Sequence, residues 1–149
     1  IEVIKEYDAD LKNVECCGGE INQVFMNILA NAIDAIEECS SEKNFEKFAE
    51  NPYQIRICTK LSDSNTAIIK IHDSGPGISQ DLCDRIFDPF FTTKPIGKGT
   101  GIGLSISWHI VIEKHGGSLR CCSIPGQGTE FAIKLPIRQK VREMAISGS

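Results

Sequence analysis

Carboxamide and carboxylate side chains recur in one segment of the chain at intervals suited to a helix. The residues concerned are Gln23, Asn27, Asn31 and Asp34. Spacings of four, four and three residues place them in one stripe on a helix. Asparagine lowers helix stability at interior positions, so two of them there indicate a functional pair. Their neutral oxygens suit Mg²⁺ that already has phosphate oxygens as ligands. An ordinary polar helix face is the alternative interpretation of this pattern alone.

A carboxylate followed by a glycine-rich turn is the second candidate. Asp73 opens the sequence Asp-Ser-Gly-Pro-Gly, which ends at Gly77. An ionised carboxylate only accepts hydrogen bonds, so it can bind the exocyclic amine of adenine and reject the carbonyl of guanine. The glycines let the backbone approach a flat ring closely. Taken alone, the pattern is also that of an ordinary turn.

The aperiodic stretch 87–103 carries glycine at every second position from 97 to 103. Such a loop leaves backbone N–H groups free to turn toward an anion. It leads into a predicted helix, whose N-terminus favours phosphate, and Lys94 and Lys98 add positive charge. A flexible linker is the alternative, but linkers do not alternate glycine so regularly. We therefore expect a loop that binds phosphate groups.

Two other nucleotide-binding motifs do not fit this loop. A Walker motif needs Ser or Thr after its lysine, whereas Gly99 follows Lys98. A dinucleotide-binding Gly-x-Gly-x-x-Gly motif beginning at Gly97 would need glycine where Ile102 stands. The triplets of protein kinases are absent from the sequence as well.

Periodicity predicts the elements that position these residues. Apolar residues recur at helical spacing after Gly18 and Gly19, which predicts a long helix to about Cys39. Shorter helices are predicted at 79–86, with Ser79 as N-cap, at 45–49, and at 103–114, ending at Gly116 and Gly117. The predicted strands are 1–7, 13–17, 53–61, 66–72, 118–123 and 130–136. This order indicates an α/β sandwich with helices on one face of a mixed sheet.

Composition limits the class of protein. A chain of 149 residues fits one compact domain, and a net charge of -4 gives no general attraction to nucleic acid or to anionic membranes. We expect no membrane contact by the domain. The seven cysteines follow no metal-binding spacing, and we interpret them as small apolar filler in a reducing cytoplasm. The chain starts without Met, and we expect it to be a piece of a longer protein.

Taken in order, five motifs resemble the ATPase domain shared by histidine kinases, gyrase, MutL and heat-shock chaperones. QVFMNILANAIDA resembles the N box of this family, HDSGPGI its first glycine box and RIFDPFFTTK its F box. GKGTGIGLSIS resembles the second glycine box, and GQGTEF resembles a third. The resemblance covers residues 1–137 and implies the Bergerat fold, a two-layer α/β sandwich with a mixed, mostly antiparallel sheet. Residues 138–149 are expected to form a flexible tail.

Within that family the details resemble a sensor histidine kinase. Gyrase and MutL carry a catalytic glutamate four residues before the Mg²⁺-binding asparagine, where this chain has Gln23. The absence of that base implies phosphoryl transfer rather than hydrolysis. The segment DPFFTTK is also similar to histidine kinases, and serine kinases of this fold lack it.

The resemblance implies a role for each motif residue. Asn27 would ligate Mg²⁺, Asn31 would contact the phosphates and Asp73 would recognise adenine, with Thr129 on the far side of the base. Phe90 and Phe91 would close on the domain that carries the acceptor histidine. The expected ATP-binding set is Asn27, Asn31, Asp34, Asp73, Gly75, Gly77, Ile78, Phe91, Thr92, Thr93, Lys94, Lys98, Gly99, Thr100, Gly101, Ile102, Gly103, Leu104 and Thr129.

The acceptor histidine is the departure from the family pattern. We interpret His72, His109 and His115 as structural or surface residues, so the acceptor and the general base would lie on a missing dimerisation domain of the same parent protein. The implied function is a cytoplasmic, monomeric ATP–Mg²⁺ binding domain whose phosphohistidine product serves a response regulator. A serine kinase of the same fold and a non-catalytic, nucleotide-gated interaction module remain alternatives.

Overall fold

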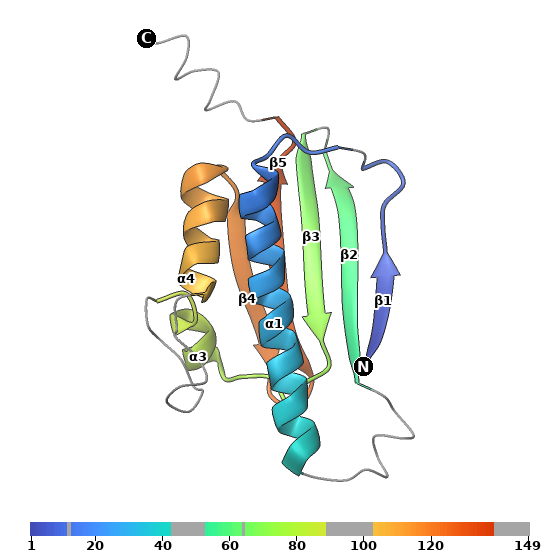
Figure 1. Cartoon of the computed structure of the whole chain (residues 1–149), viewed down its shortest axis with the longest axis vertical. Coiled ribbons are helices and arrows are strands. Elements are labelled where there is room, and N and C mark those ends of the chain that lie inside the picture. Colours follow the sequence, from blue (N-terminus) through green and yellow to red (C-terminus); the bar gives the residue numbers. More distant parts are fainter. Residues whose placement is uncertain (12, 43–52, 64, 89–102, 139–149) are drawn as a thin grey trace.

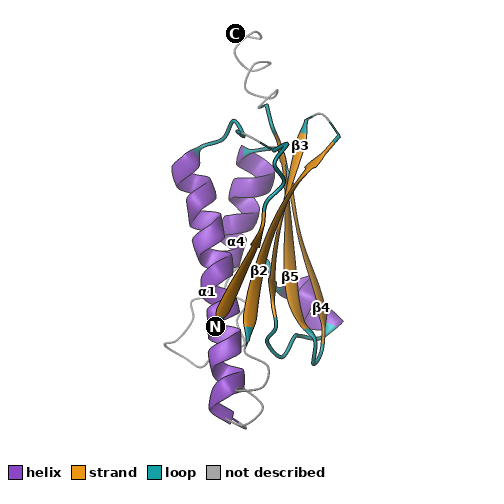
Figure 2. Cartoon of the chain, turned by 90° about the vertical axis from the view of Figure 1, so that its right-hand side faces the viewer, coloured by secondary structure: helices purple, strands orange, loops and turns teal. Residues whose placement is uncertain are grey.

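The computed structural model describes residues 1–11, 13–42, 53–63, 65–88 and 103–138. One five-stranded sheet carries the helices on one side (Figures 1 and 2). The strands are β1 (Glu2–Glu6), β2 (Gln54–Ser62), β3 (Thr66–Asp73), β4 (Ser118–Ile124) and β5 (Gly128–Pro136). The helices are α1 (Gly18–Glu42), α3 (Gln80–Arg85), α4 (Gly103–Trp108) and the π-helical segment η1 (His109–Lys114).

The strands are ordered β1-β2-β3-β5-β4. β1 pairs with β2 in parallel, and every other neighbouring pair is antiparallel. The predicted two-layer α/β class with a mixed, mostly antiparallel sheet is therefore confirmed. No helix among the described residues is long and apolar enough to cross a membrane.

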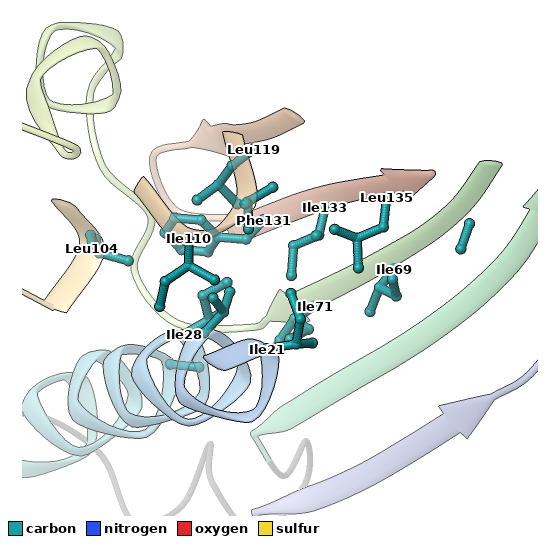
Figure 3. Packing of buried hydrophobic residues seen from close by; sticks show 14 of the residues in the cluster. Ile21, Ile28, Ile69, Ile71, Leu104, Ile110, Leu119, Phe131, Ile133 and Leu135 are labelled. Carbon is teal, nitrogen blue, oxygen red and sulfur yellow. The ribbon is translucent and has the colours of Figure 1, made fainter. Parts of the chain in front are cut away.

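The core lies between α1 and the covered face of the sheet (Figure 3). Helical spacing brings the apolar residues of α1 to one side, and strand alternation brings every second residue of β3 and β5 to the same layer. The central members are Ile21, Val24, Ile28, Ala32, Ile36, Ile69, Ile71, Phe131, Ile133 and Leu135. Burial of each large aliphatic side chain contributes about 1.5–3 kcal/mol, so this layer fixes α1 over the middle of the sheet.

A buried histidine joins the two long helical segments at one end. His115 is 4% exposed, its Nδ1 lies 2.8 Å from the Ile110 carbonyl, and its Nε2 accepts a hydrogen bond from the Cys17 backbone N–H at 3.0 Å. The carbonyl can only accept, so Nδ1 carries the hydrogen. Beside it, Lys114 forms an ion pair with Glu20 at 2.7 Å. These contacts hold the end of η1 against the start of α1.

Two sequence expectations for this region are corrected. Residues 13–17 form no strand: they pair with no strand of the sheet, and Glu15 N donates to the carbonyl of Ile137, which lies just beyond the end of β5. Gly18 and Gly19 do not precede the helix but form its first turn, since the Cys17 carbonyl already accepts from Ile21 N.

The remaining helices and strands agree with prediction, except that one helix changes its hydrogen-bond pattern and that the ends of several elements differ by a residue or two. The predicted helix 103–114 is continuous, but its second half is π-helical. It ends at Lys114, two residues before Gly116, whose φ of 67° is left-handed. Ser79 caps α3 by accepting from Leu82 N. The predicted helix at 45–49 and the tail from 139 onward lie outside the described residues.

Candidate functional site

The side chain of Asn27 bridges α1 and the start of α4. Its Nδ2 donates to the Gly103 carbonyl at 2.9 Å and to Ser107 Oγ at 3.2 Å. Ser107, which is fully buried, also donates to the Gly103 carbonyl at 2.9 Å. Because Nδ2 must face these acceptors, Oδ1 points away from α4 and accepts from the exposed Gln23 at 3.0 Å. The oxygen of Asn27 is thus presented at the surface, where it could ligate a cation.

The Asp73 carboxylate lies at the end of β3, at the opposite end of the site. It is 4% exposed, and its Oδ1 accepts from Gly75 N at 2.9 Å. Burial raises the pKa of Asp73 above the ordinary aspartate value, while hydrogen bonds from Gly75 and Thr129 and the nearby His72 act in the opposite direction. The result is a desolvated carboxylate with spare acceptor capacity, which can bind a donor on a flat ring.

Glycine is required where two loops meet at this carboxylate. Gly128 has a φ of 102°, and a Cβ there would lie 2.0 Å from the Asp73 carbonyl oxygen. Gly77 has a φ of 73°, and its Cβ would lie 2.4 Å from the Ile124 carbonyl oxygen. Gly126 N donates to the Pro76 carbonyl at 2.6 Å. The turn after β3 therefore packs directly on the β4–β5 hairpin.

A serine that the sequence did not single out ties these loops together. Ser123 Oγ accepts from Ile78 N at 2.7 Å and donates to the Gly128 carbonyl at 2.9 Å. Thr129 Oγ1 lies 2.9 Å away on the neighbouring strand. Ile78, predicted as a site residue, is thus anchored by its backbone.

Helix α1 connects the two ends of the site. A Cβ at Gly103 would contact the Asn27 side chain at 3.6 Å, and a Cβ at Gly75 would contact Ala35 at 3.4 Å. Eight residues of helix at 1.5 Å each separate Asn27 from Ala35 by about 12 Å. Asn31 lies between them on the same stripe and is partly buried. This arrangement suits an elongated ligand with a ring at one end and anionic groups at the other.

The glycine beside the carboxylate fits a nucleotide base. A Cβ at Gly75 would lie 2.8 Å from Asp73 Oδ1, so a side chain there would crowd the group expected to contact the base. Thr129 is 8% exposed and pairs with Asp73 across β3 and β5. Asp73, Gly75 and Thr129 are therefore brought together, and Gly77 lies in the same turn, packed against the Ile124 carbonyl.

Other predicted site residues are placed differently or lie outside the described part of the chain. Asp34 is partly buried on α1. The side chain of Leu104 belongs to the hydrophobic core, so only its backbone is available to a ligand. Phe91, Thr92, Thr93, Lys94, Lys98, Gly99, Thr100, Gly101 and Ile102 lie outside the described residues.

The three histidines occupy structural or surface positions, in agreement with prediction. His115 is buried between helices, and His109 is exposed and paired with Glu113. His72 lies between Arg56 and Glu130 in the strand register of β2, β3 and β5. No role could be predicted from the sequence for Ser107, Ser123 or the contact of His115 with α1, because a serine or histidine becomes informative only when the element beside it is known.

Known proteins resemble this chain in sequence and in fold. Residues 18–139 match the family profile of the histidine kinase-, DNA gyrase B- and HSP90-like ATPases. Sensor kinase CckA of Brucella abortus is 36% identical, over 91% of this chain and 14% of its own length. Signal transduction histidine-protein kinase AtoS of Escherichia coli is 41% identical, over 92% of this chain and 20% of its own length. The chain thus spans a fifth or less of these two relatives.

Solved structures show the same likeness. The catalytic domain of histidine kinase ThkA gives a TM-score of 0.71 at 31% identity, covering 91% of this chain and 79% of that domain. ThkA in complex with the response regulator protein TrrA gives a TM-score of 0.68 at 27% identity, covering 93% of this chain and 34% of that chain.

Proposed function

This chain belongs to the histidine kinase-, DNA gyrase B- and HSP90-like ATPases as a histidine kinase catalytic domain, and we propose that it binds ATP with Mg²⁺ and donates the γ-phosphate to a histidine on a separate dimerisation domain. The observation that supports this best is the stretch of α1 from Ala35 to Asn27. It connects the end of the site that holds Asp73 with the end that holds Asn27. The buried carboxylate offers an acceptor for the adenine amine. Asn31 and then Asn27 follow along α1 toward Gly103, at the start of α4.

Each described residue has a defined task in this proposal. Asp73 orients the base, and Gly75 leaves the space for it. Asn27 Oδ1 points outward and would bind Mg²⁺ instead of accepting its hydrogen bond from Gln23. Asn31 contacts the phosphates. Mg²⁺ supplies charge neutralisation on the triphosphate. Because the protein ligand is a single neutral carboxamide, the metal would share its coordination with phosphate oxygens.

The residues outside the described ranges complete the proposal. Lys94, Lys98 and the glycines at 97, 99 and 101, which lead to Gly103, would cover the phosphates, and Phe90 and Phe91 would contact the dimerisation domain. ThkA forms a complex with a response regulator protein, which supports a partner of the same class here. Because the proposed substrate is ATP, we propose that the domain lies in the cytoplasm, where ATP is supplied.

Calorimetric titration of this chain with ATP and GTP, with and without Mg²⁺, tests the binding step. We expect a preference for ATP that depends on Mg²⁺. Replacing Asn27 and Asn31 together by Ala should remove the Mg²⁺-dependent part of the affinity, a loss of about tenfold or more for lost charge-assisted contacts. Unchanged Mg²⁺-dependent affinity in that variant would refute the proposed metal and phosphate site.

Transfer is tested separately by adding a histidine-bearing dimerisation domain from a related kinase together with radiolabelled ATP. An acid-labile, alkali-stable phosphoprotein is the expected product. An acid-stable product would indicate a serine kinase, and tight ATP binding with no transfer would indicate an interaction module.

A further inference from the structure

We infer that Trp108 is a positioning residue for phosphate binding and that it acts through Phe87, an inference that rests on the proposed function. Phe87 lies in the turn that follows α3, and Trp108 is the last residue of α4. Their ring centroids are 5.1 Å apart, and their planes are inclined by 35°. The contact joins the chain on the two sides of residues 89–102, so it closes the polypeptide between them into a loop.

The ring of Phe87 is held between the sheet and α4. Its second neighbour is Phe131 on β5, whose centroid lies 6.2 Å away in an edge-on arrangement. Phe131 is 4% exposed and belongs to the hydrophobic core, so it offers Phe87 a fixed surface. Tilted and edge-on rings at these distances attract each other beyond the effect of burial. Trp108 therefore completes a row of three rings that fixes the point where the chain enters residues 89–102.

The point where the chain leaves residues 89–102 is fixed separately. There α4 begins at Gly103, whose carbonyl accepts a hydrogen bond from Asn27 Nδ2 at 2.9 Å. Bringing the two ends of a loop together costs conformational entropy. When the fold has already met that cost, the ligand does not have to meet it on binding. The ring contact at the entry and the Asn27 contact at the exit should therefore both increase the affinity for the phosphate groups.

The base end of the site does not depend on this row of rings. Gly128 on the β4–β5 hairpin packs on the backbone of Asp73, and this contact fixes the carboxylate proposed to bind adenine. Leu104 supplies a core contact of α4, whereas Trp108 is 40% exposed. Loss of the Trp108 ring should therefore weaken the binding of phosphate groups and leave the binding of the base unchanged.

The test compares ATP with AMP, which carries the same base and ribose but lacks the two outer phosphates. Calorimetry measures ATP directly and AMP by displacement, on this chain and on Trp108→Ala. We expect the affinity for ATP to fall about two- to tenfold, the effect of one aromatic pair, and the affinity for AMP to stay the same. Trp108→Phe keeps a ring and should restore most of the loss. Ile106→Ala is the matched control, because Ile106 is 42% exposed on the same helix, and it should bind both nucleotides as the unmodified chain does.

A second background shows whether Trp108 acts through Phe87. Phe87→Leu keeps an apolar side chain against Phe131 but removes the ring, so it should lower the affinity for ATP by itself. Adding Trp108→Ala to it should then cause no further loss, because the two residues act as one unit. Additive losses, or equal losses for ATP and AMP in Trp108→Ala, would overturn the inference.

Two further outcomes are distinguishable. Should Trp108→Ala fail to fold by circular dichroism, Trp108→Leu replaces it, because leucine keeps apolar volume without a ring; unchanged affinity for ATP in the folded replacement counts against the inference. An unmodified chain that bound ATP no more tightly than AMP would refute the phosphate site of the proposed function itself. An unmodified chain that preferred ATP, together with a Trp108→Ala variant that kept this preference in full, would refute the role of Trp108 alone.

Discussion

At the residue scale, the pKa of the Asp73 carboxylate is subject to two opposing influences, burial and hydrogen bonding. Burial disfavours its ionised form and raises its pKa, although Gly75 N partly compensates by donating to it. Since the folded pKa lies above the unfolded value, the stability that Asp73 contributes is fully present below the ordinary aspartate range and is lost as pH rises through the raised pKa. Adenine binding favours the ionised form, which burial of the carboxylate disfavours.

The affinity for ATP should therefore fall on acidification at a higher pH than an ordinary aspartate would produce. Titrations with ATP across the acidic range, on the unmodified chain and on Asp73→Asn, measure this effect. The phosphates of ATP titrate in both proteins, so the difference between the two curves belongs to Asp73. We expect Asp73→Asn to bind ATP more weakly at neutral pH and to lack this additional dependence. Parallel curves would show that the carboxylate does not contact the base.

The sequence predicted Asp73 as an acceptor for adenine because a carboxylate before a glycine turn has an intrinsic chemical meaning. It could not predict Ser123 or Ser107. Each matters through neighbours that are distant in sequence, such as Ile78 for Ser123 and Asn27 for Ser107. A lone serine in a strand or helix carries no sign of which atoms will surround it.

At the scale of elements, the turn after β3 and the β4–β5 hairpin form one unit because glycine lets their backbones touch. Gly128 and Gly126 provide a matched pair, since both have left-handed φ angles of 102° and 84°. A Cβ at Gly128 would overlap the Asp73 carbonyl, whereas a Cβ at Gly126 would meet nothing within 4 Å.

Gly128→Ala should lower the free energy of unfolding by more than about 3 kcal/mol, as backbone strain and overlap add. Gly126→Ala should cost only about 1–2 kcal/mol, from strain alone. Urea unfolding followed by circular dichroism measures both. Equal losses would show that the two loops are not packed as described.

The contact between η1 and α1 allows a second matched comparison, between two histidines on one helical segment. His115→Ala leaves the Cys17 N–H without its buried partner and should lower the free energy of unfolding by about 1–3 kcal/mol. His109→Ala removes an exposed side chain paired with Glu113 and should change it by less than about 1 kcal/mol. The midpoint of urea unfolding distinguishes the two, and a harmless His115→Ala would contradict the bridging role.

Periodicity predicted most elements because burial imposes it. Helical spacing of apolar residues defined α1, and alternation in β3 and β5 follows from one covered face. Prediction failed at 13–17, where alternating residues lead into the helix with one backbone bond to Ile137. It also missed the π-helical winding of η1, which changes hydrogen-bond partners without changing which residues are apolar.

At the scale of the whole molecule, the cysteines fall into different environments. Some are buried as apolar filler, and others lie at the surface. Cys83 is buried, and its sulfur lies 3.7 Å from the sulfur of Cys121. This contact joins α3 to β4. Burial and the neighbouring Cys83 raise the pKa of Cys121 strongly. Cys17 and Cys122 are exposed.

Alkylation of the native chain at neutral pH, followed by peptide mass spectrometry, should label Cys17 and Cys122 first. The thiolate is the reactive form, so Cys83 and Cys121 should react only when the chain unfolds, and their labelling should accelerate in urea. Early labelling of Cys83 would mean that α3 opens readily from β4. The number and order of cysteines were evident from the sequence, but the Cys83–Cys121 contact required the fold that brings α3 beside β4.

The contact between the rings of Phe87 and Trp108 has a practical consequence. Trp108 is the only tryptophan of the chain; it is 40% exposed and its ring centroid lies 5.1 Å from that of Phe87. Phe87 precedes the segment proposed to cover the phosphates, and Trp108 follows Gly103 by little more than one helical turn. Indole emission responds to changes in solvent contact and ring packing, so the chain contains an intrinsic fluorophore next to the segment proposed to cover the phosphates. Rapid mixing with nucleotide can therefore be followed without any attached dye.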